Sequence, residues 1–385
     1  MDTSTTTTAH GVLDAVRELA PAIAGRAAEI ETARRVPRDV LDQLIRAGCF
    51  RLLLPPSHGG IGSDLPAALR VFEDLARSDA SAAWTVMIGA SAWVDLAGLP
   101  RARFDELFPA DRAVIVAGAI APTGRITGVD GGYRVTGRWG FISGCEHADW
   151  LWGDCVEAVV DGVPHLRGAV FSPDQVVIED TWDVSGLAGT GSHHVHVTDV
   201  DVPADRTFPI DVDEPCLDEA LVRIPVPALL AVEVASVAIG TAQGALDDIV
   251  ALATDKVPLL APQPLADNAL FQFELATADT ELRAARGLLY ETAEMLWATA
   301  AARRSLTLVE RARARAAAVW ATERAAAAVG AAYRAGGGTS IYADCPLQRR
   351  LRDVHAMTQH FLVKRDTLTT AGAVLAGRDI DVPVF

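Results

Sequence analysis

Hydrophobic residues in the first part of the chain recur every three to four positions, which is the period of an amphipathic helix. Val12–Ala33 and Val36–Phe50 both follow this spacing, and Pro37 stands where a proline fits the first turn of a helix. The loop Leu52–Asp64 is rich in Pro and Gly, and the helical period resumes after it. The pattern predicts an N-terminal helical domain over residues 1–116.

The pattern changes near residue 117, where short runs of alternating apolar and polar residues are separated by turn residues. The sequence Asp-Gly-Gly at 130–132 lies between two such runs, a position typical of a β-hairpin. The run His193–Pro203 alternates in the same way and ends in a proline. These features predict a β domain over residues 117–212.

After Pro227 the chain returns to long helical stretches rich in Ala, Leu, Glu and Arg. They are interrupted at Lys256–Pro264 and at Ala335–Ser340, so we expect one continuous helical stretch between these breaks and a final helix after them. The apolar run Ile224–Gly240 is short for a membrane span and contains Glu233. We interpret it as a buried helix of a C-terminal helical domain, residues 213–385.

Composition narrows the possible partners and compartment. The 385 residues carry a formal net charge of −16, which argues against binding to nucleic acid or to an anionic membrane. The N-terminus lacks the basic and apolar regions of a signal peptide. The five cysteines are far apart and form no CxxC motif, which favours the reducing cytoplasm.

The final helix is expected to begin near Pro346 and to continue past His360. Its core-facing stripe would consist of Leu347, Leu351, Val354 and Phe361. Arg349 and Asp353 have the spacing of an ion pair that stabilises the helix.

On such a helix Asp353, Met357 and His360 share one face, whereas His355 points about 140° away from His360. Spacing alone favours a surface or packed histidine at position 360 over a catalytic one.

Two glycine-containing segments could contact a flat ligand. Gly186–Val195 combines small residues with two hydroxyls in a turn, and backbone amides in such turns can hydrogen-bond a phosphate or a planar cofactor. Gly137–Trp150 contains three aromatic residues and Ser143, which would suit either a core or the wall of a ring-binding site. Glycine-rich turns are common, so neither segment identifies a ligand by itself.

Two further clusters have ordinary interpretations that we prefer. His194 and His196 lie on one face of a predicted strand and could bind a metal, but no third ligand has suitable spacing. A basic helical segment, in so acidic a chain, is expected to be solvated or to face another subunit; its arginines are Arg303, Arg304, Arg311, Arg313 and Arg315.

Taken in order, four segments resemble the acyl-CoA dehydrogenase superfamily and, more narrowly, its flavin-dependent monooxygenase branch. They are Leu52–Asp64, VDGGYRVTGRWGFISGCEHADW, VSGLAGTGSHHVHVTDVDVPADR and AGGGTSIYADCPLQRRLRDVHAMTQH. The last is the most specific, because a glycine turn, a Pro-Leu-Gln-Arg helix start, Arg-Asp and a later histidine occur together. The resemblance covers nearly the whole chain and implies an N-terminal helical domain, a β-barrel-like middle domain and a C-terminal four-helix bundle.

The resemblance changes the interpretation of His360. Dehydrogenases of the superfamily carry a glutamate base in this part of the chain, but no carboxylate occurs here between Asp353 and Asp366. The monooxygenase branch has a histidine at the position of His360, so the resemblance implies that His360 is catalytic. Two departures, Ala188 in place of the usual arginine and His194 in place of a small polar or acidic residue, imply that flavin is held somewhat differently.

The resemblance also implies which residues form the site. Ser143 would act with His360 by hydrogen-bonding the flavin near N5 or O4. The implied flavin contacts are Trp139, Phe141, Ser143, Thr190, Gly191, Ser192, Gly337, Gly338 and Thr339, and the implied substrate pocket is Trp84, Ile88, Ser91, Trp93 and Met357.

The implied reaction needs a reduced flavin from a separate reductase, since the chain has no dinucleotide fingerprint. Reduced FMN is the first choice and FAD the second. With O₂ it would form a C4a-hydroperoxide that oxygenates an aromatic or heteroatom-containing small molecule, and His360 would either deprotonate the substrate or hold the distal oxygen. No metal is expected. A homotetramer is implied, in which the Gly337–Gly338 turn reaches the flavin of a neighbouring chain.

Two alternatives stay open at this point. One is a flavin dehydrogenase or oxidase that acts on an acyl thioester, and the other is a flavin-binding protein without turnover.

Overall fold

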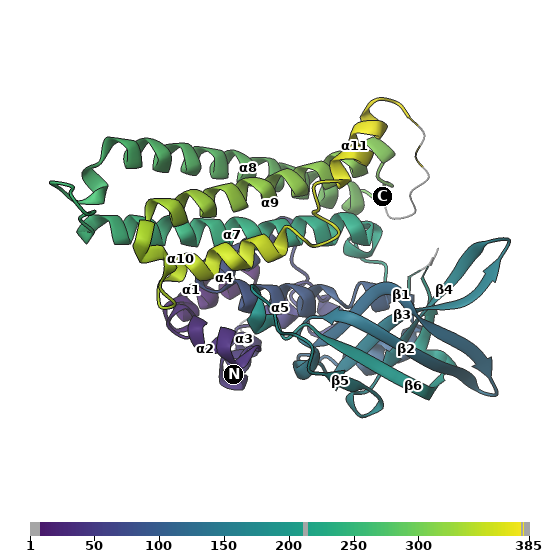
Figure 1. The fold of residues 1–385 in the computed structure, drawn as a ribbon. Helices are drawn as coiled ribbons and strands as arrows, with labels where there is room; N and C mark the ends of the chain where they lie inside the picture. The colour runs from purple at the N-terminus through teal and green to yellow at the C-terminus, as the bar shows by residue number, and fades with distance from the viewer. Residues whose placement is uncertain (1–7, 211–214, 379, 381–385) are drawn as a thin grey trace, which may run out of the picture.

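The computed structural model describes residues 8–210, 215–378 and 380, and shows a helical region, a β-sheet and a long helical bundle (Figure 1). The N-terminal helices are α1 (Ala9–Gly25), α2 (Ala27–Ala33), α3 (Arg38–Arg46), α4 (Leu65–Ser78), α5 (Ala80–Ser91) and α6 (Arg101–Leu107). Asp64 and Asp79 cap α4 and α5 by accepting hydrogen bonds from backbone N–H groups of the first turn. Every residue of α5 except Ile88 is buried, so this helix lies at the centre of the molecule.

The middle of the chain forms one seven-stranded sheet in the order β5-β6-β2-β1-β3-β4-β7. Its strands are β1 (Val116–Val129), β2 (Gly132–Ile142), β3 (Trp150–Val160), β4 (Val163–Phe171), β5 (Val177–Glu179), β6 (His193–Pro203) and β7 (Thr207–Pro209). β1 and β3 are parallel, and the other neighbouring strands are antiparallel. The predicted hairpin at 130–132 is confirmed, because β1 and β2 pair up to Val129 and Gly132.

The C-terminal region contains α7 (Val226–Asp255), α8 (Ala269–Ala301), α9 (Leu308–Ala335), α10 (Pro346–Met357) and α11 (Thr367–Leu375). The continuous stretch expected after Pro264 is in fact two helices, because Thr307 and Glu310 form a capping box that starts α9. α7 is long and apolar enough to cross a membrane, but 89% of its most apolar 18-residue stretch is buried within the structure. It is a buried helix of the bundle, as predicted. The predicted domain boundary at 212/213 lies outside the described residues.

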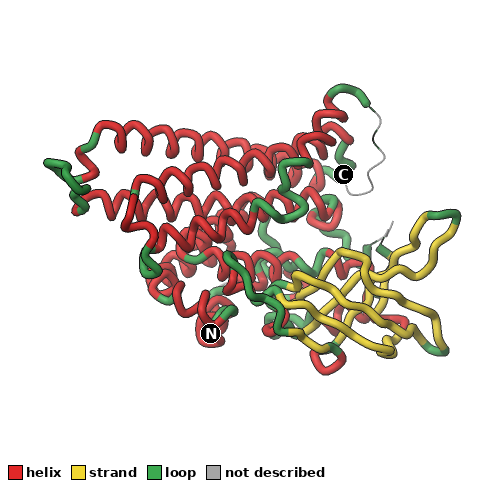
Figure 2. The backbone as a smooth tube through the Cα atoms, in the orientation of Figure 1, coloured by secondary structure: helices red, strands yellow, loops and turns green. Residues whose placement is uncertain are grey.

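The bundle lies across the N-terminal helices, and the sheet adjoins one end of this assembly (Figure 2). The turn after α10 is therefore close to α5 and the sheet, whereas the turn between α9 and α10 is at the opposite end of the bundle (Figure 1). Residues of the predicted site are thus divided between the two ends.

The end of α10 corrects one prediction. The helix stops at Met357, where the Thr358 hydroxyl donates to the carbonyl oxygen of His355 at 2.7 Å, so His360 lies in a turn and not on a helix. Phe361 is 46% exposed and does not belong to the core stripe; Leu362 and Val363 are buried instead. The angle of about 140° expected between His355 and His360 assumed one continuous helix and therefore does not apply. His355 itself is exposed.

Candidate active site

Trp84 brings together the two residues expected to be catalytic. Its indole Nε1–H donates to Ser143 Oγ at 3.0 Å, and its ring centre lies 5.5 Å from that of His360, edge to face. Trp84 comes from α5, Ser143 follows β2 and His360 follows α10. Three segments that are distant in the sequence therefore meet where the helical region, the sheet and the bundle adjoin.

Ser143 continues into a row of buried hydroxyls, which we call the hydroxyl row: Ser143, Ser192 and Thr190. The oxygen atoms of Ser143 and Ser192 are 2.8 Å apart, and those of Ser192 and Thr190 are 2.6 Å apart. Thr190 donates to the carbonyl oxygen of Leu187 at 2.8 Å. The turn Gly186–Ser192 is thus hydrogen-bonded directly to the residue that the resemblance places at the flavin.

The Arg-Asp pair of α10 holds this turn in place. Leu187 has a left-handed φ of 55°, and its N–H donates to Asp353 Oδ1 at 2.7 Å, while Arg352 donates to the Ser185 carbonyl at 2.7 Å. Burial raises the pKa of Asp353 to about 7. The predicted pairing of Asp353 with Arg349 is therefore wrong: the carboxylate faces the turn. A Cβ on Gly186 would lie 2.2 Å from a backbone oxygen of α10, so glycine permits this close approach.

An exposed aromatic surface lies beside the hydroxyl row. Phe141 is 73% exposed and has a φ of 63°, an unusual backbone conformation for a bulky residue. Its ring is 6.0 Å from that of Trp182 and 6.3 Å from that of His194. Trp182 Nε1–H donates to the Leu187 carbonyl at 3.0 Å. Trp182 was not predicted, because its sequence position before the turn does not indicate that its ring folds back onto Phe141.

His360 is held in its neutral form. Burial and the nearby guanidinium of Arg315 lower the pKa of His360 to about 4. The Leu362 N–H donates to His360 Nδ1 at 3.4 Å, which leaves the proton of the neutral ring on Nε2. His360 is thus a hydrogen-bond donor at Nε2 and a weak base.

Arg315 is an exception to the expected solvated or intersubunit arginine face, whereas Arg303, Arg304 and Arg313 are exposed. It is only 4% exposed, and its Nε–H donates to the Leu362 carbonyl at 3.3 Å. Burial lowers the pKa of Arg315 itself. The residue therefore lies beneath the turn that carries His360, and its charge acts on that imidazole.

Several predicted site residues lie elsewhere. Trp139 is buried in the core of the sheet, where its Nε1–H donates to the Asp154 carbonyl at 2.8 Å, so it cannot lie against a cofactor. Met357 is fully buried in the helical core, and Trp93 packs against Phe104 with ring centres 6.4 Å apart. The implied pocket is thereby reduced mainly to Trp84 and Ile88.

Ser91 faces the interior of the bundle. Its Oγ lies 2.6 Å from the Met87 carbonyl and 2.9 Å from Oε1 of Glu233, a fully buried residue of α7. Burial raises the pKa of Glu233 to about 8. Its protonated carboxyl can therefore donate to Ser91, while the Ser91 proton goes to Met87.

The glycine turn before α10 is remote from Ser143 within this chain. Gly337 and Gly338 are exposed at the far end of the bundle, and Gly337 has a left-handed φ of 55°. Lys256 Nζ donates to Thr339 Oγ1 at 2.5 Å and fixes the turn to the end of α7. These residues and the hydroxyl row cannot contact one small ring system from a single chain.

The histidine-rich strand has no metal-binding geometry. His196 Nδ1 lies 2.8 Å from Glu179 Oε1, and His193 Nδ1 accepts from the backbone N–H groups of Thr181 and Trp182. Within the described ranges no group of three or more His, Cys, Asp or Glu residues could hold a metal ion.

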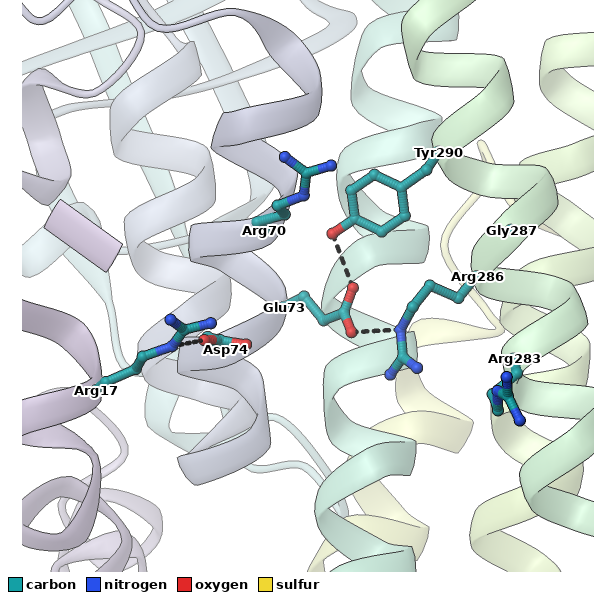
Figure 3. Close-up of a pocket in the computed structure, with 8 residues that line it drawn as sticks. All are labelled: Arg17, Arg70, Glu73, Asp74, Arg283, Arg286, Gly287 and Tyr290. Atoms are coloured by element: carbon teal, nitrogen blue, oxygen red, sulfur yellow. Dashed lines mark hydrogen bonds and ion pairs between the residues drawn. The ribbon is translucent and has the colours of Figure 1, made fainter. Parts of the chain in front are cut away.

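A cavity of about 410 Å³ lies away from these residues, between α1, α4 and α8 (Figure 3). Glu73 accepts from Arg286 at 2.6 Å and from the Tyr290 hydroxyl at 2.8 Å, and Asp74 pairs with Arg17 at 2.7 Å. The cavity is lined by Arg17, Arg70, Glu73, Asp74, Arg283, Arg286, Gly287 and Tyr290. The contacts of Glu73 with Arg286 and Tyr290 join α4 to α8 of the bundle, and solvent screens the exposed Arg17, Arg70 and Arg283.

Comparison with known proteins identifies the family. Two protein-family models match the chain. The model of the acyl-CoA dehydrogenase N-terminal domain matches residues 6–98, and that of the acyl-CoA dehydrogenase C-terminal domain matches residues 232–365. The chain is 32% identical to the indole-3-acetate monooxygenase of Pseudomonas putida, covering 96% of this chain and 93% of that protein. It is 31% identical to a flavin-dependent monooxygenase oxygenase subunit, HsaA, of Rhodococcus jostii, covering 89% of this chain and 92% of that protein.

The chain is a flavin-dependent monooxygenase of the acyl-CoA dehydrogenase superfamily. The crystal structure of 3-HSA hydroxylase from Rhodococcus sp. RHA1 agrees with this assignment at a TM-score of 0.91 and 28% identity, covering 98% of this chain and 99% of that one. The predicted family, fold class and oxygenase activity are thereby confirmed. The monooxygenase also has groups that suit a flavin: Phe141 offers an exposed flat face, and Ser143 offers a hydroxyl beside it.

Proposed function

We propose that the monooxygenase oxygenates a planar aromatic small molecule, such as an indole or a phenol, with the flavin ring against Phe141 and its N5 edge at Ser143. The observation that carries this proposal is the meeting of Trp84, Ser143 and His360 at one point. A separate reductase would supply the reduced flavin, which provides the two electrons that activate O₂. All five cysteines are free, which suits the cytoplasm, where such a reductase works.

His360 is best suited to donate a hydrogen bond from Nε2 to the reacting oxygen. A histidine whose pKa is about 4 is a poor base for a phenol or an amine, because proton transfer to it would be strongly uphill. Its Nδ1 already accepts from Leu362, so Nε2–H is the free polar atom. Of the two roles implied by the resemblance, holding the distal oxygen therefore fits this imidazole better than deprotonation.

The surroundings of these residues favour exclusion of water. Trp84 and the hydroxyl row are buried, and the groups at the junction of Trp84, Ser143 and His360 are neutral: an indole, hydroxyls and an imidazole. Neutral groups hold little hydration, so a planar substrate can displace the remaining water without a large desolvation cost. A dry site protects an activated oxygen from loss as hydrogen peroxide.

We further propose a homotetramer in which the Gly337–Gly338 turn of one chain completes the flavin site of another. That end of the bundle exposes a group of large apolar side chains, which is unusual for a free surface: Val257, Leu259, Leu260, Leu270, Phe273, Ile341 and Tyr342. Light scattering at micromolar concentration should give the tetramer mass, and a monomer that binds flavin normally would contradict this assembly.

The experiment for the proposed function uses the purified chain with chemically reduced flavin and a panel of indoles and phenols. After O₂ is admitted, oxygenated product and hydrogen peroxide are both measured. We expect product from at least one planar aromatic compound, with a matching decrease in peroxide. Peroxide alone across the panel, with no oxygenated product, would contradict a planar aromatic substrate.

A further inference from the structure

The contacts of the hydroxyl row fix the direction of each hydrogen bond. Thr190 Oγ1 lies 2.8 Å from the Leu187 carbonyl oxygen, and a carbonyl oxygen can only accept, so Thr190 must donate. A hydroxyl has one proton. The 2.6 Å contact between Thr190 and Ser192 must therefore be donated by Ser192.

The same count determines the state of Ser143. The Ser192 proton points to Thr190, so the 2.8 Å contact between Ser143 and Ser192 must be donated by Ser143. The indole Nε1–H of Trp84 can only donate, so Ser143 accepts there at 3.0 Å. Ser143 thus has no proton left to give, but it keeps one free lone pair on Oγ.

We propose that the hydroxyl row makes Ser143 an obligate acceptor, and that this selects the reduced flavin over the oxidised one. The inference rests on the proposed function, which puts the N5 edge of the flavin beside Ser143. N5 of a reduced flavin carries a hydrogen and can donate to Ser143 Oγ. N5 of an oxidised flavin is an acceptor, so it would face a second acceptor. Trp84, Ser192 and Thr190 are then positioning residues that act through Ser143.

The direction of the row is difficult to reverse. Reversal would leave Thr190 Oγ1 and the Leu187 carbonyl oxygen, two buried acceptors, 2.8 Å apart with no proton between them, which is unfavourable. Leu187 is itself held by Asp353 at its N–H and by Trp182 at its carbonyl. The direction of the hydrogen bond at the Leu187 carbonyl therefore sets the direction of those made by Thr190, Ser192 and Ser143.

The preference for reduced over oxidised flavin should equal the gain of one hydrogen bond from the reduced N5–H to Ser143, plus the cost of an acceptor–acceptor contact with the oxidised N5. This corresponds to roughly 10- to 100-fold in Kd. It would let the oxygenase take reduced flavin in the presence of oxidised flavin and release the oxidised form after turnover.

The test compares Thr190→Val, which removes the hydroxyl but keeps the shape, with Thr190→Ser, which keeps the hydroxyl. Kd values for reduced and oxidised FMN, and for reduced and oxidised FAD, are measured under anaerobic conditions by fluorescence titration. In Thr190→Val the Ser192 proton can turn to Ser143, whose own proton becomes free to donate. Oxidised flavin should then bind roughly 10-fold tighter, with little change for reduced flavin, whereas Thr190→Ser should keep the wild-type ratio.

Ser192→Ala gives a second measurement, because it also frees the Ser143 proton and should reduce the selectivity in the same way. Equal weakening of both redox forms in Thr190→Val and Ser192→Ala would show a merely structural role and overturn the inference. So would a wild-type protein that binds both forms equally. If the wild type binds neither form, the proposed function fails and this inference fails with it.

Discussion

Two polar clusters join the N-terminal helices to the rest of the molecule, and they differ in charge. At the cavity between α1, α4 and α8, both carboxylates are ion-paired, Glu73 with Arg286 and Asp74 with Arg17. At the Trp84–Ser143–His360 junction the contacts involve neutral groups, and burial together with the nearby Arg315 lowers the pKa of His360 and keeps it uncharged. Carboxylates held in ion pairs join parts of the fold, whereas neutral donors and acceptors stay available to a ligand.

The difference also affects the reactivity of each cluster. Burial and neighbouring Glu73 raise the pKa of the Tyr290 hydroxyl, so this group stays protonated and bound. The Nε2–H of His360 has no such acceptor among its described contacts. The cluster with more charge is therefore the less reactive one. Three of the four substitutions below test this contrast, and the fourth, at Glu233, tests a buried carboxyl outside both clusters.

The largest effect is expected from His360→Ala, which removes the donor at the neutral junction. Product formation should fall by roughly 10²-fold or more, as is typical for loss of a hydrogen-bond donor positioned at a reacting oxygen, while folding and flavin binding persist. Product and hydrogen peroxide should be measured together, because the lost product should reappear as peroxide. His355→Ala is the control, since His355 is exposed. Equal, mild effects of the two changes would mean that His360 is structural.

Arg286→Met tests the charged cluster. It leaves the nearly buried Glu73 carboxylate without its guanidinium partner, so the free energy of unfolding should fall by roughly 2 to 4 kcal/mol. Product formed per folded molecule should not change. Urea denaturation and an assay at low temperature separate the two quantities. Loss of activity without loss of stability would contradict the structural role given to this cluster.

Glu233→Gln should have a smaller effect that depends on pH. The pKa of Glu233 is raised to about 8 in the folded protein, so the folded state binds the extra proton between its ordinary pKa and pH 8. That contribution is complete at low pH and is lost as pH rises toward 8. The variant should therefore show a higher Tm than the wild type at pH 8 and little difference at pH 5. A pH-independent difference would mean that Glu233 is not protonated by the fold.

The smallest and most specific effect is expected from Arg315→Met. Removal of the buried charge should raise the pKa of His360 from about 4 toward its ordinary value, and Arg315→Lys should retain the lower pKa. Because the folded pKa is depressed, neutral His360 contributes stability that is lost as pH falls below about 6.5, and the variant should lose less. Nitrogen-15 NMR of histidine-labelled protein measures the pKa and tautomer without turnover. An unchanged pKa of His360 in Arg315→Met would mean that Arg315 has no electrostatic effect on this imidazole.

The sequence predicted the order of domains because helical and strand periods change clearly along the chain. It misplaced the end of α10, since the hydrophobic spacing continues to Phe361 while the chain turns after Met357, and it did not indicate α11. It also misread Arg315: α9 is rich in alanine and buried on several faces, so an arginine in a basic run can lie inside. Contacts such as Asp353 with Leu187 join residues that are 166 positions apart, and no local pattern indicates them.

The exposed glycine turn at the far end of the bundle has a consequence for genetics. If each flavin site combines His360 of one chain with Gly337 of another, then every active site is built from two copies of the chain. A chain with His360→Ala and a chain with Gly337→Trp would each be inactive alone, yet tetramers assembled from both would contain some sites with neither defect. Co-expression of two defective alleles should therefore restore part of the activity, as in intragenic complementation.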